Sequence, residues 1–343
     1  MSQTRIGPLV EAINARLTDP SRNRIVGETA GKPPRFELYH MFLSLCSYKL
    51  RTTLAEKEAA YFSHDVDIFP PEIQNYYPEY VKLRLQGRED TTGNLVNGYT
   101  GRSSTETEGF DPCVVPTLVD HEAEKVLANS KRICVYLDSV LDSGTKLIPQ
   151  DIEDDIIHQL DVVDRTPHVA ALYGPHPDKD VRPAFMQKSM VVVHDAKIAK
   201  CRENMALVGD DPELIAAYEH KIAKEAAAKL FVRTEARMRD VIQEFRDIIE
   251  QLDKDLKATG GEWLFGDRFT LADVFWACSL YRIRWLGLGY IFESEDSPQY
   301  SRRVSAYCGR LMDRPSFRRS VIDWPLHPPS EHLPEYHQVG GLT

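Results

Sequence analysis

Strand-like segments occur only in the first half of this chain, and this change of pattern constrains its fold most strongly. Short apolar runs alternate with helical patterns up to residue 138, whereas residues 152–320 carry helical patterns alone. We expect four strands, at Phe36–Met41, Tyr61–Phe69, Val114–Asp120 and Lys125–Leu127. The sequence therefore predicts an α/β domain with helices on both faces of a sheet, followed by an all-α domain.

The expected boundaries divide the 343 residues into four parts. Residues 1–35 form an N-terminal extension with a short amphipathic helix, residues 36–138 the α/β domain, residues 139–321 the helical domain, and residues 322–343 an extended tail. Residues 86–112 interrupt the α/β domain with a segment rich in Gly, Thr and Ser. Such a long loop is usually functional, and the sequence leaves open whether it covers a site or meets a partner subunit.

Two helix signals mark the second domain. A long helical pattern runs from Glu213 to Lys257, with an interruption expected at residues 232–234 and a glycine stop at Gly260. Thr270 and Asp273 then have the spacing of a capping box, which predicts the start of another helix.

Composition excludes several classes of function. The formal net charge of −10, without a basic stripe, disfavours a nucleic-acid partner. The six cysteines are far apart and form no C-x-x-C pair, so we expect neither zinc nor a disulfide framework and place the chain in the reducing cytoplasm. No window approaches the ~18 apolar residues of a membrane span.

Cys46 is the strongest candidate for chemistry. It lies at the expected start of a helix, between Ser44 and Ser47, where free backbone N–H groups and hydroxyls stabilise a thiolate. The alternative is that Cys46 packs with Leu50 and Leu54 on one apolar helix face, and that the serines merely cap the helix. We interpret Cys46 as a nucleophile and the other five cysteines as packing residues.

Three segments together resemble the glutathione site of the glutathione transferase superfamily, which lies on a thioredoxin-like domain. They are Ser44-Leu45-Cys46-Ser47, Val115-Pro116 before the third strand, and Asn129-Ser130 before a helix. Within that superfamily the chain most resembles the glutathione-dependent reductive dehalogenases of chlorinated hydroquinones, which carry Ser-x-Cys-Ser at the same junction. The segments 110–120, 166–170 and 324–329 are also similar to that group.

The resemblance implies specific roles in catalysis and in glutathione binding. Cys46 would be the catalytic nucleophile, and Ser44 would hold and activate the glutathione sulfur. The backbone of Val115, before a cis Pro116, would pair with the cysteinyl part of glutathione. Ser130 would bind the γ-glutamyl carboxylate at a helix start.

Further side chains would complete the site. Ser47 would lie beside the sulfur, the Asn129 amide would bond the γ-glutamyl group, and Lys49 would meet the glycyl carboxylate unless it is only a surface lysine. A phenolate substrate needs positive charge and hydrogen-bond donors. We expect these, and the aromatic walls of its site, from His40, His168, Tyr173, Tyr281, Arg282, Arg284 and Trp285.

The implied activity is reductive dehalogenation of a chlorinated hydroquinone, with two glutathiones oxidised through a mixed disulfide at Cys46 and no metal. A chlorinated gentisate is an alternative substrate. Alternative functions are a glutathione-dependent cis–trans isomerase, which would not need Cys46, a glutathione transferase or aryl-ether-cleaving enzyme, and a non-catalytic interaction module. The resemblance also implies a homodimer.

Overall fold

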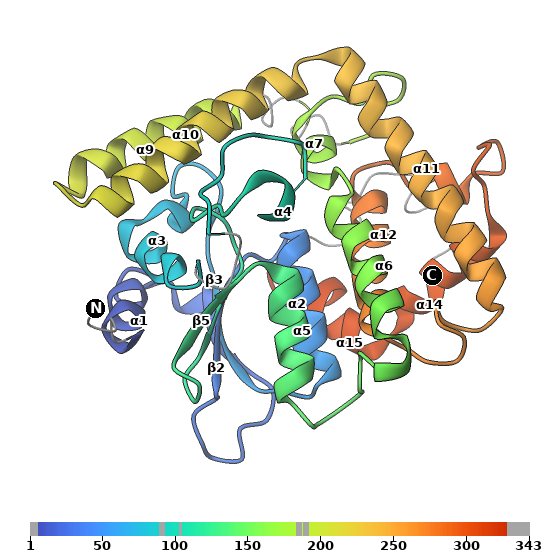
Figure 1. Cartoon of the computed structure of the whole chain (residues 1–343), viewed down its shortest axis with the longest axis horizontal. Coiled ribbons are helices and arrows are strands. Elements are labelled where there is room, and N and C mark those ends of the chain that lie inside the picture. The colour runs from blue at the N-terminus through green and yellow to red at the C-terminus, as the bar shows by residue number, and fades with distance from the viewer. Residues whose placement is uncertain (1–5, 89–92, 103–104, 183–186, 188–191, 328–343) are drawn as a thin grey trace.

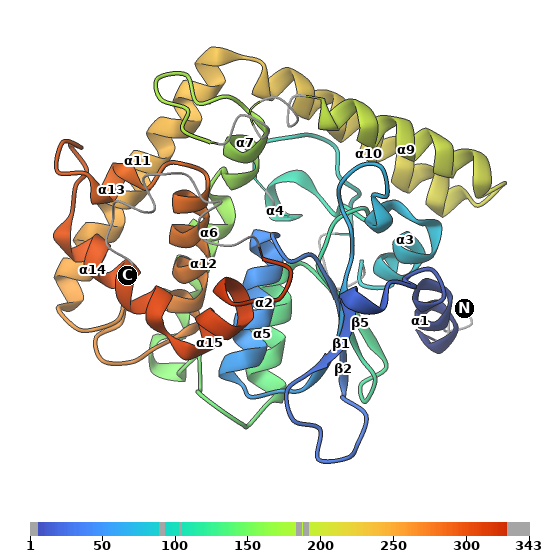
Figure 2. The same cartoon turned by 180° about the vertical axis from the view of Figure 1, so that it is seen from behind.

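The computed structural model describes residues 6–88, 93–102, 105–182, 187 and 192–327. An α/β domain lies beside a helical domain, as the two opposite views show (Figure 1, Figure 2). This arrangement confirms the predicted fold class.

The sheet has five strands in the order β1-β3-β2-β4-β5, of which only β2 and β3 are parallel. Strand β3 ends at Asp65 rather than at Phe69, because its partner strands extend no further: Asn23 of β1 lies opposite His64, and His40 of β2 lies opposite Asp65. The strands span β1 Asn23–Val26, β2 Phe36–His40, β3 Tyr61–Asp65, β4 Thr117–Asp120 and β5 Lys125–Ala128.

The N-terminal segment belongs to this domain structurally. Helix α1 (Ile6–Asn14) buries Val10 and Ile13, the face that the amphipathic pattern indicates. Its Asn14 side chain donates to Glu37 of the sheet at 2.7 Å. Strand β1, which the sequence analysis did not predict, pairs antiparallel with β3 at the sheet edge; a four-residue edge strand between turns carries too little periodicity to be recognised.

Helices cover both faces of the sheet. Helices α2 (Leu45–Glu56) and α5 (Ser130–Val140) pack in one core cluster with Phe36 and Leu38. Tyr39 and Met41 point the other way and pack with α1 and α3 (Pro78–Leu85). The alternation of β2 side chains thus supplies two separate cores.

The helical domain surrounds α12, which is buried along nearly its whole length. Thr270 and Asp273 form the predicted capping box at its start. The bounds are α6 Glu153–Arg165, α7 His168–Tyr173, α9 Val193–Leu207, α10 Pro212–Val232, α11 Glu235–Thr259, α12 Leu271–Trp285, α13 Tyr290–Glu293, α14 Arg302–Asp313 and α15 Pro315–Phe317.

Helices α9 and α10 form a long hairpin that reaches over the α3 side of the α/β domain (Figure 1). The boundary between α10 and α11 lies at the interruption that the sequence predicts. Helix α9 was not predicted, because its polar and apolar residues show no clear periodicity.

The described part of the 86–112 segment packs against helices of its own chain. The Arg102 guanidinium pairs with Glu244 of α11 at 2.6 Å, and Asp111 pairs with Lys221 of α10 at 2.7 Å. The segment contains the short helix α4 (Thr105–Glu108). The sequence leaves open whether this segment covers a site or meets a partner subunit. Its packing against α10 and α11 of the same chain fits the first use.

The C-terminal tail lies against the α/β domain as far as it is described. Trp324 donates its indole N–H to Asp65 at 3.1 Å. Residues 328–343 of the predicted tail lie outside the described residues. Among the helices that are described, none is both long and apolar enough to span a membrane.

Candidate active site

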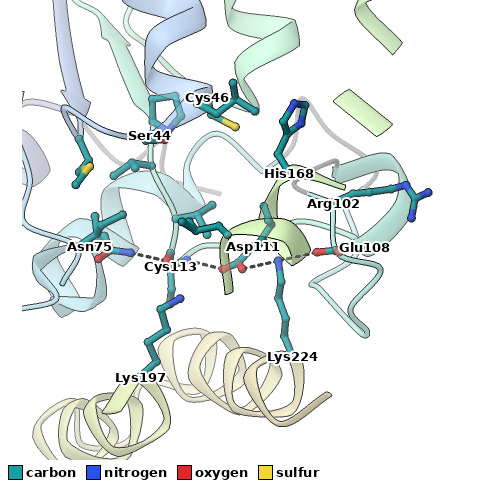
Figure 3. A pocket seen from close by; sticks show the side chains of 18 of the residues that line it. Ser44, Cys46, Asn75, Arg102, Glu108, Asp111, Cys113, His168, Lys197 and Lys224 are labelled. Atoms are coloured by element: carbon teal, nitrogen blue, oxygen red, sulfur yellow. Dashed lines mark hydrogen bonds and ion pairs between the residues drawn. The ribbon is translucent and has the colours of Figure 1, made fainter. Parts of the chain in front are cut away.

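A cavity of about 200 Å³ opens where the α/β domain, the 86–112 segment and the helical domain meet. Figure 3 shows Ser44 and Cys46 on one side of this cavity and Lys197 and Lys224 on the opposite side, with Asp111 and Glu108 between them. One side of the cavity therefore carries a thiol and hydroxyls, and the other carries charged groups.

The thiol side is the start of helix α2. Ser44 is the N-cap residue, and its Oγ accepts the Ser47 N–H at a long 3.4 Å. Cys46 follows as the second helical residue, where the N–H groups of the first turn have no partner within the helix. A thiolate there is stabilised by the helix dipole.

Cys46 is the only one of the six cysteines, all of them within the described ranges, that is not buried. Burial raises the pKa of the Cys201, Cys278 and Cys308 thiols to about 12. It raises the pKa of the remaining two thiols, Cys113 and Cys134, well above the ordinary value. These five groups stay protonated, so Cys46 is the candidate nucleophile.

Buried side chains hold the backbone of Phe42 and Leu43, which precede Ser44, in place. The guanidinium of the fully buried Arg51 donates to the carbonyls of Phe42 at 3.1 Å and Ser320 at 2.7 Å. Asp65 accepts the Phe42 N–H at 2.9 Å. Arg282, on α12, donates to the Leu43 carbonyl. Both domains therefore position the residues that lead into the catalytic helix.

Val115 and Pro116 line the cavity and are joined by a cis peptide, as predicted. The N–H and C=O of Val115 make no hydrogen bond to any other described residue. Arg84 donates to the Pro116 carbonyl and, at 2.9 Å, to the Asp111 carbonyl, which fixes this loop. An extended peptide can add to the backbone N–H and C=O of Val115, unpaired among the described residues, as an extra strand.

Asn129 and Ser130 also line the cavity, at the start of α5. Asn129 is the N-cap, and its side-chain oxygen accepts the Arg132 N–H at 3.3 Å. The amide nitrogen of Asn129 and the helix N-terminus at Ser130 suit an anionic or zwitterionic end group.

Two residues expected in the glutathione site lie elsewhere. Lys49 is fully buried, forms an ion pair with Asp164, and lies 4.4 Å from the centre of the Phe275 ring. It cannot meet the glycyl carboxylate, because helix α2 turns it into the domain interface. Ser47 is also fully buried, and its Oγ accepts the Met41 N–H at 3.2 Å.

Three residues expected at the aromatic substrate are also misplaced. His40 is fully buried and hydrogen-bonds to Ser63 at 2.7 Å, and burial lowers the pKa of its imidazole well below the usual value. Arg284 forms an ion pair with Glu293. Tyr281 is buried with its hydroxyl 3.1 Å from His327 Nε2. None of the three predicted residues reaches the cavity wall.

The other four predicted substrate residues do line the cavity: His168, Tyr173, Arg282 and Trp285. Burial lowers the pKa of His168 well below its usual value, and its Nε2 lies 2.9 Å from Ser279 Oγ. The imidazole therefore lines the cavity as an uncharged ring. The Arg282 Nε makes no hydrogen bond among the described residues.

The charged side of the cavity was missed from the sequence. Lys221 pairs with Asp111 at 2.7 Å and with Glu225 at 3.0 Å. Lys224 pairs with Glu108 at 2.8 Å and with Asp111 at 3.1 Å. One signal could have revealed it: residues 214, 218, 221, 225, 228 and 232 form one buried stripe of α10, and two of them are charged. Charged residues on a helix's apolar face indicate buried partners.

We expect the free energy of unfolding to fall as the pH drops below about 4. Burial disfavours the charged forms of Asp111 and Glu225, but neighbouring lysines outweigh this effect and hold both pKa values below the ordinary carboxyl value. Lys221 and Lys224 lower the pKa of Asp111. Lys197 and Lys221 lower the pKa of Glu225. In the unfolded chain both carboxyls take up protons near pH 4. Their contribution to stability is therefore complete above that pH and is lost as the pH approaches the folded pKa values.

Urea unfolding at about pH 7 and about pH 3.5 measures this loss. Asp111→Asn should flatten the dependence, whereas Asp142→Asn, at an exposed position, should not change it. Equal slopes for the two variants would contradict the assignment.

Comparisons with known proteins agree with this architecture. The family described as "Glutathione S-transferase, C-terminal domain" matches residues 223–310. Among solved structures, the beta-etherase LigF from Sphingobium sp. strain SYK-6 aligns with a TM-score of 0.54 at 16% identity, over 83% of this chain and 98% of that chain. Maleylacetoacetate isomerase from Methylobacterium extorquens AM1 aligns at 0.50 and 15% identity, over 85% and 100%. These similarities show the fold.

Two proteins of Sphingobium indicum, from strains B90A and UT26, are far more similar. Both are named 2,5-dichlorohydroquinone reductive dechlorinase, and each is 47% identical over 328 residues, which cover 95% of this chain and 94% of the relative. The chain is therefore an enzyme of the glutathione transferase superfamily and belongs to the family of the 2,5-dichlorohydroquinone reductive dechlorinases.

Proposed function

We propose that this enzyme removes chlorine from a chlorinated hydroquinone, using glutathione as the reductant. The observation that carries the proposal is Cys46, whose half-buried side chain lines the cavity at a helix start beside Ser44. The names of the two relatives favour the same reaction. A chlorinated gentisate stays an alternative substrate.

Glutathione fits the thiol side of the cavity as the co-substrate. The backbone of Val115 would pair with its cysteinyl part, and Ser130 with the helix start behind it would take its γ-glutamyl carboxylate. Ser44 Oγ would donate to the glutathione thiolate. Because Ser44 Oγ only accepts the Ser47 N–H, at 3.4 Å, its own O–H can donate to the sulfur without breaking that bond.

The reaction proceeds in three steps. The glutathione thiolate attacks the chlorine-bearing carbon of the keto tautomer, so that a C–S bond forms and chloride leaves. The Cys46 thiolate then attacks the thioether sulfur; an S–S bond forms, the C–S bond breaks, and the ring carbon takes up a proton. A second glutathione thiolate attacks the glutathione sulfur of the mixed disulfide; glutathione disulfide forms, and the Cys46 thiolate leaves. Sulfur supplies both electrons.

The decisive assay is incubation of the protein with glutathione and 2,5-dichlorohydroquinone. We expect chloride and glutathione disulfide to be released in equal amounts. Conversion of a maleyl-type acid without chloride release would favour the isomerase alternative. Cleavage of an aryl ether, with no chloride released from the hydroquinone, would favour the alternative of an ether-cleaving transferase.

We further propose that the enzyme is a two-fold homodimer, the commonest symmetric assembly of soluble proteins. Each site is expected to be complete within one chain, because Cys46, Val115, Ser130 and Arg282 line one cavity of a single chain. Sedimentation at micromolar concentration should give twice the 39.1 kDa mass of the chain. A fully active species of single mass would contradict the dimer.

A further inference from the structure

The charged side of the cavity contains a histidine that the steps above leave unused. His194, near the start of α9, is 1% exposed and lines the cavity. Its Nδ1 lies 2.6 Å from the Glu225 carboxylate, whereas its Nε2 is buried and makes no hydrogen bond among the described residues. A buried polar atom without a partner costs about 1–3 kcal/mol, so it calls for an explanation, and a catalytic role is one of them.

The bond to Glu225 fixes the tautomer. An ionised carboxylate only accepts hydrogen bonds, so Nδ1 carries a proton, which leaves Nε2 as the ring nitrogen that can accept one. Glu225 is itself buried, and its pKa is held low despite burial by Lys197, Lys221 and the His194 bond. The carboxylate therefore stays charged and can stabilise an imidazolium.

The other groups around His194 come from four elements. The Tyr173 ring of α7 lies 5.0 Å away, and Lys197 of α9 donates to the Tyr173 hydroxyl at 3.0 Å. Lys221 of α10 and Tyr76 of the 3-10 helix Gln74–Tyr76 approach Glu225 at 3.0 and 3.3 Å. Asp195, next in the chain, is paired with Lys229. Among the described residues, Glu225 bonds the His194 ring and Tyr173 packs against it, and His194 also lines the cavity.

We propose that His194 Nε2 binds a ring hydroxyl of the substrate and accepts its proton. This inference rests on the proposed function, because it gives the dechlorinase the base that forms the phenolate on the way to the keto tautomer. The hydroxyl O–H bond breaks, an Nε2–H bond forms, and the imidazolium is balanced by Glu225. The same nitrogen returns the proton when the product hydroxyl forms again.

Two substitutions separate binding from proton transfer. His194→Asn keeps an amide where Nδ1 contacts Glu225 but leaves nothing in the place of Nε2. His194→Gln places an amide near Nε2, which can hydrogen-bond the hydroxyl but cannot take its proton. We expect kcat/KM for 2,5-dichlorohydroquinone to fall by ~10²-fold in both. KM for the hydroquinone should rise only in the Asn variant, and KM for glutathione should change in neither.

A spectroscopic probe measures the proton transfer directly. The phenolate of 4-nitrophenol absorbs in the visible range, so a pH titration of the bound probe gives its ionised fraction. We expect the wild-type protein to lower the apparent pKa of bound 4-nitrophenol and both variants to return it toward the solution value. His220→Asn is the matched control, because His220 lies on α10 outside the cavity lining, with Nδ1 on the Val96 carbonyl at 2.7 Å.

Each result has one meaning. Unchanged kcat/KM and an unchanged nitrophenol titration in folded His194 variants would overturn the proposal while the dechlorinase stands. A raised KM for glutathione alone would also overturn it, since His194 would then bind glutathione. A wild-type protein that ionises nitrophenol but releases no chloride from 2,5-dichlorohydroquinone would overturn the proposed function and leave the hydroxyl site.

Discussion

Cys46→Ser should stop ring reduction completely while chloride is still released. In the proposed course the glutathione thiolate carries out the first substitution, which would need Ser44 and the Val115 backbone rather than the Cys46 sulfur. The second step requires a thiolate to attack the thioether sulfur, and a serine hydroxyl remains protonated near neutral pH. A glutathionyl-hydroquinone should therefore accumulate, at most one per chloride released, and mass spectrometry should detect it.

The control is Cys201→Ser, which changes a buried thiol of α9 outside the cavity. It should lower stability slightly and keep the product distribution of the wild type. If Cys46→Ser still forms the dechlorinated hydroquinone at the wild-type rate, Cys46 is a packing residue and the three-step course is wrong.

Ser44→Ala should slow the first substitution by a factor of ~10²–10³, the usual effect of losing one donor to a developing or resident anion. Without the hydroxyl, the pKa of bound glutathione should rise and less thiolate should be present near neutral pH. Stability should fall only by about 0.5–1 kcal/mol, because the capping bond that is lost is already long. Stopped-flow absorbance of the glutathione thiolate, measured against pH, separates the two effects.

Glutathione affinity should change little in Ser44→Ala, since the contacts proposed for Val115 and Ser130 do not involve the lost hydroxyl. Ser44→Thr retains the hydroxyl and should restore most of the rate, which makes it the conservative control. A large loss of affinity with an unchanged substitution rate would instead make Ser44 a positioning residue.

The parts of the site that depend on local sequence could be predicted. Ser44 and Cys46 at the strand-to-helix junction, the Val115-Pro116 turn and Ser130 at a helix start all lie in the cavity wall. In each case the backbone places the group, so the sequence pattern alone determines its direction.

The parts that depend on distant partners could not be predicted. Lys49 lies on the expected helix, but its direction is set by Asp164, 115 residues later. His194 is a candidate base only because Glu225, 31 residues away on another helix, bonds its Nδ1. Long polar side chains turn toward whichever opposite charge the tertiary structure supplies, and a periodicity analysis does not contain that information.

The ion pairs that join Asp111 to Lys221 and Lys224 of α10 limit how this enzyme can be recombined with its relatives. Asp111, Lys221 and Lys224 come from two segments that neighbour each other only in the folded chain, and the first two are buried. A chimera that exchanges the 86–112 segment without the α9–α10 hairpin would leave the buried Lys221 with Glu225 alone and would remove both carboxylates that pair with Lys224. Breaking a buried ion pair costs about 3–5 kcal/mol. We therefore expect a stable chimera only when these two segments are exchanged together.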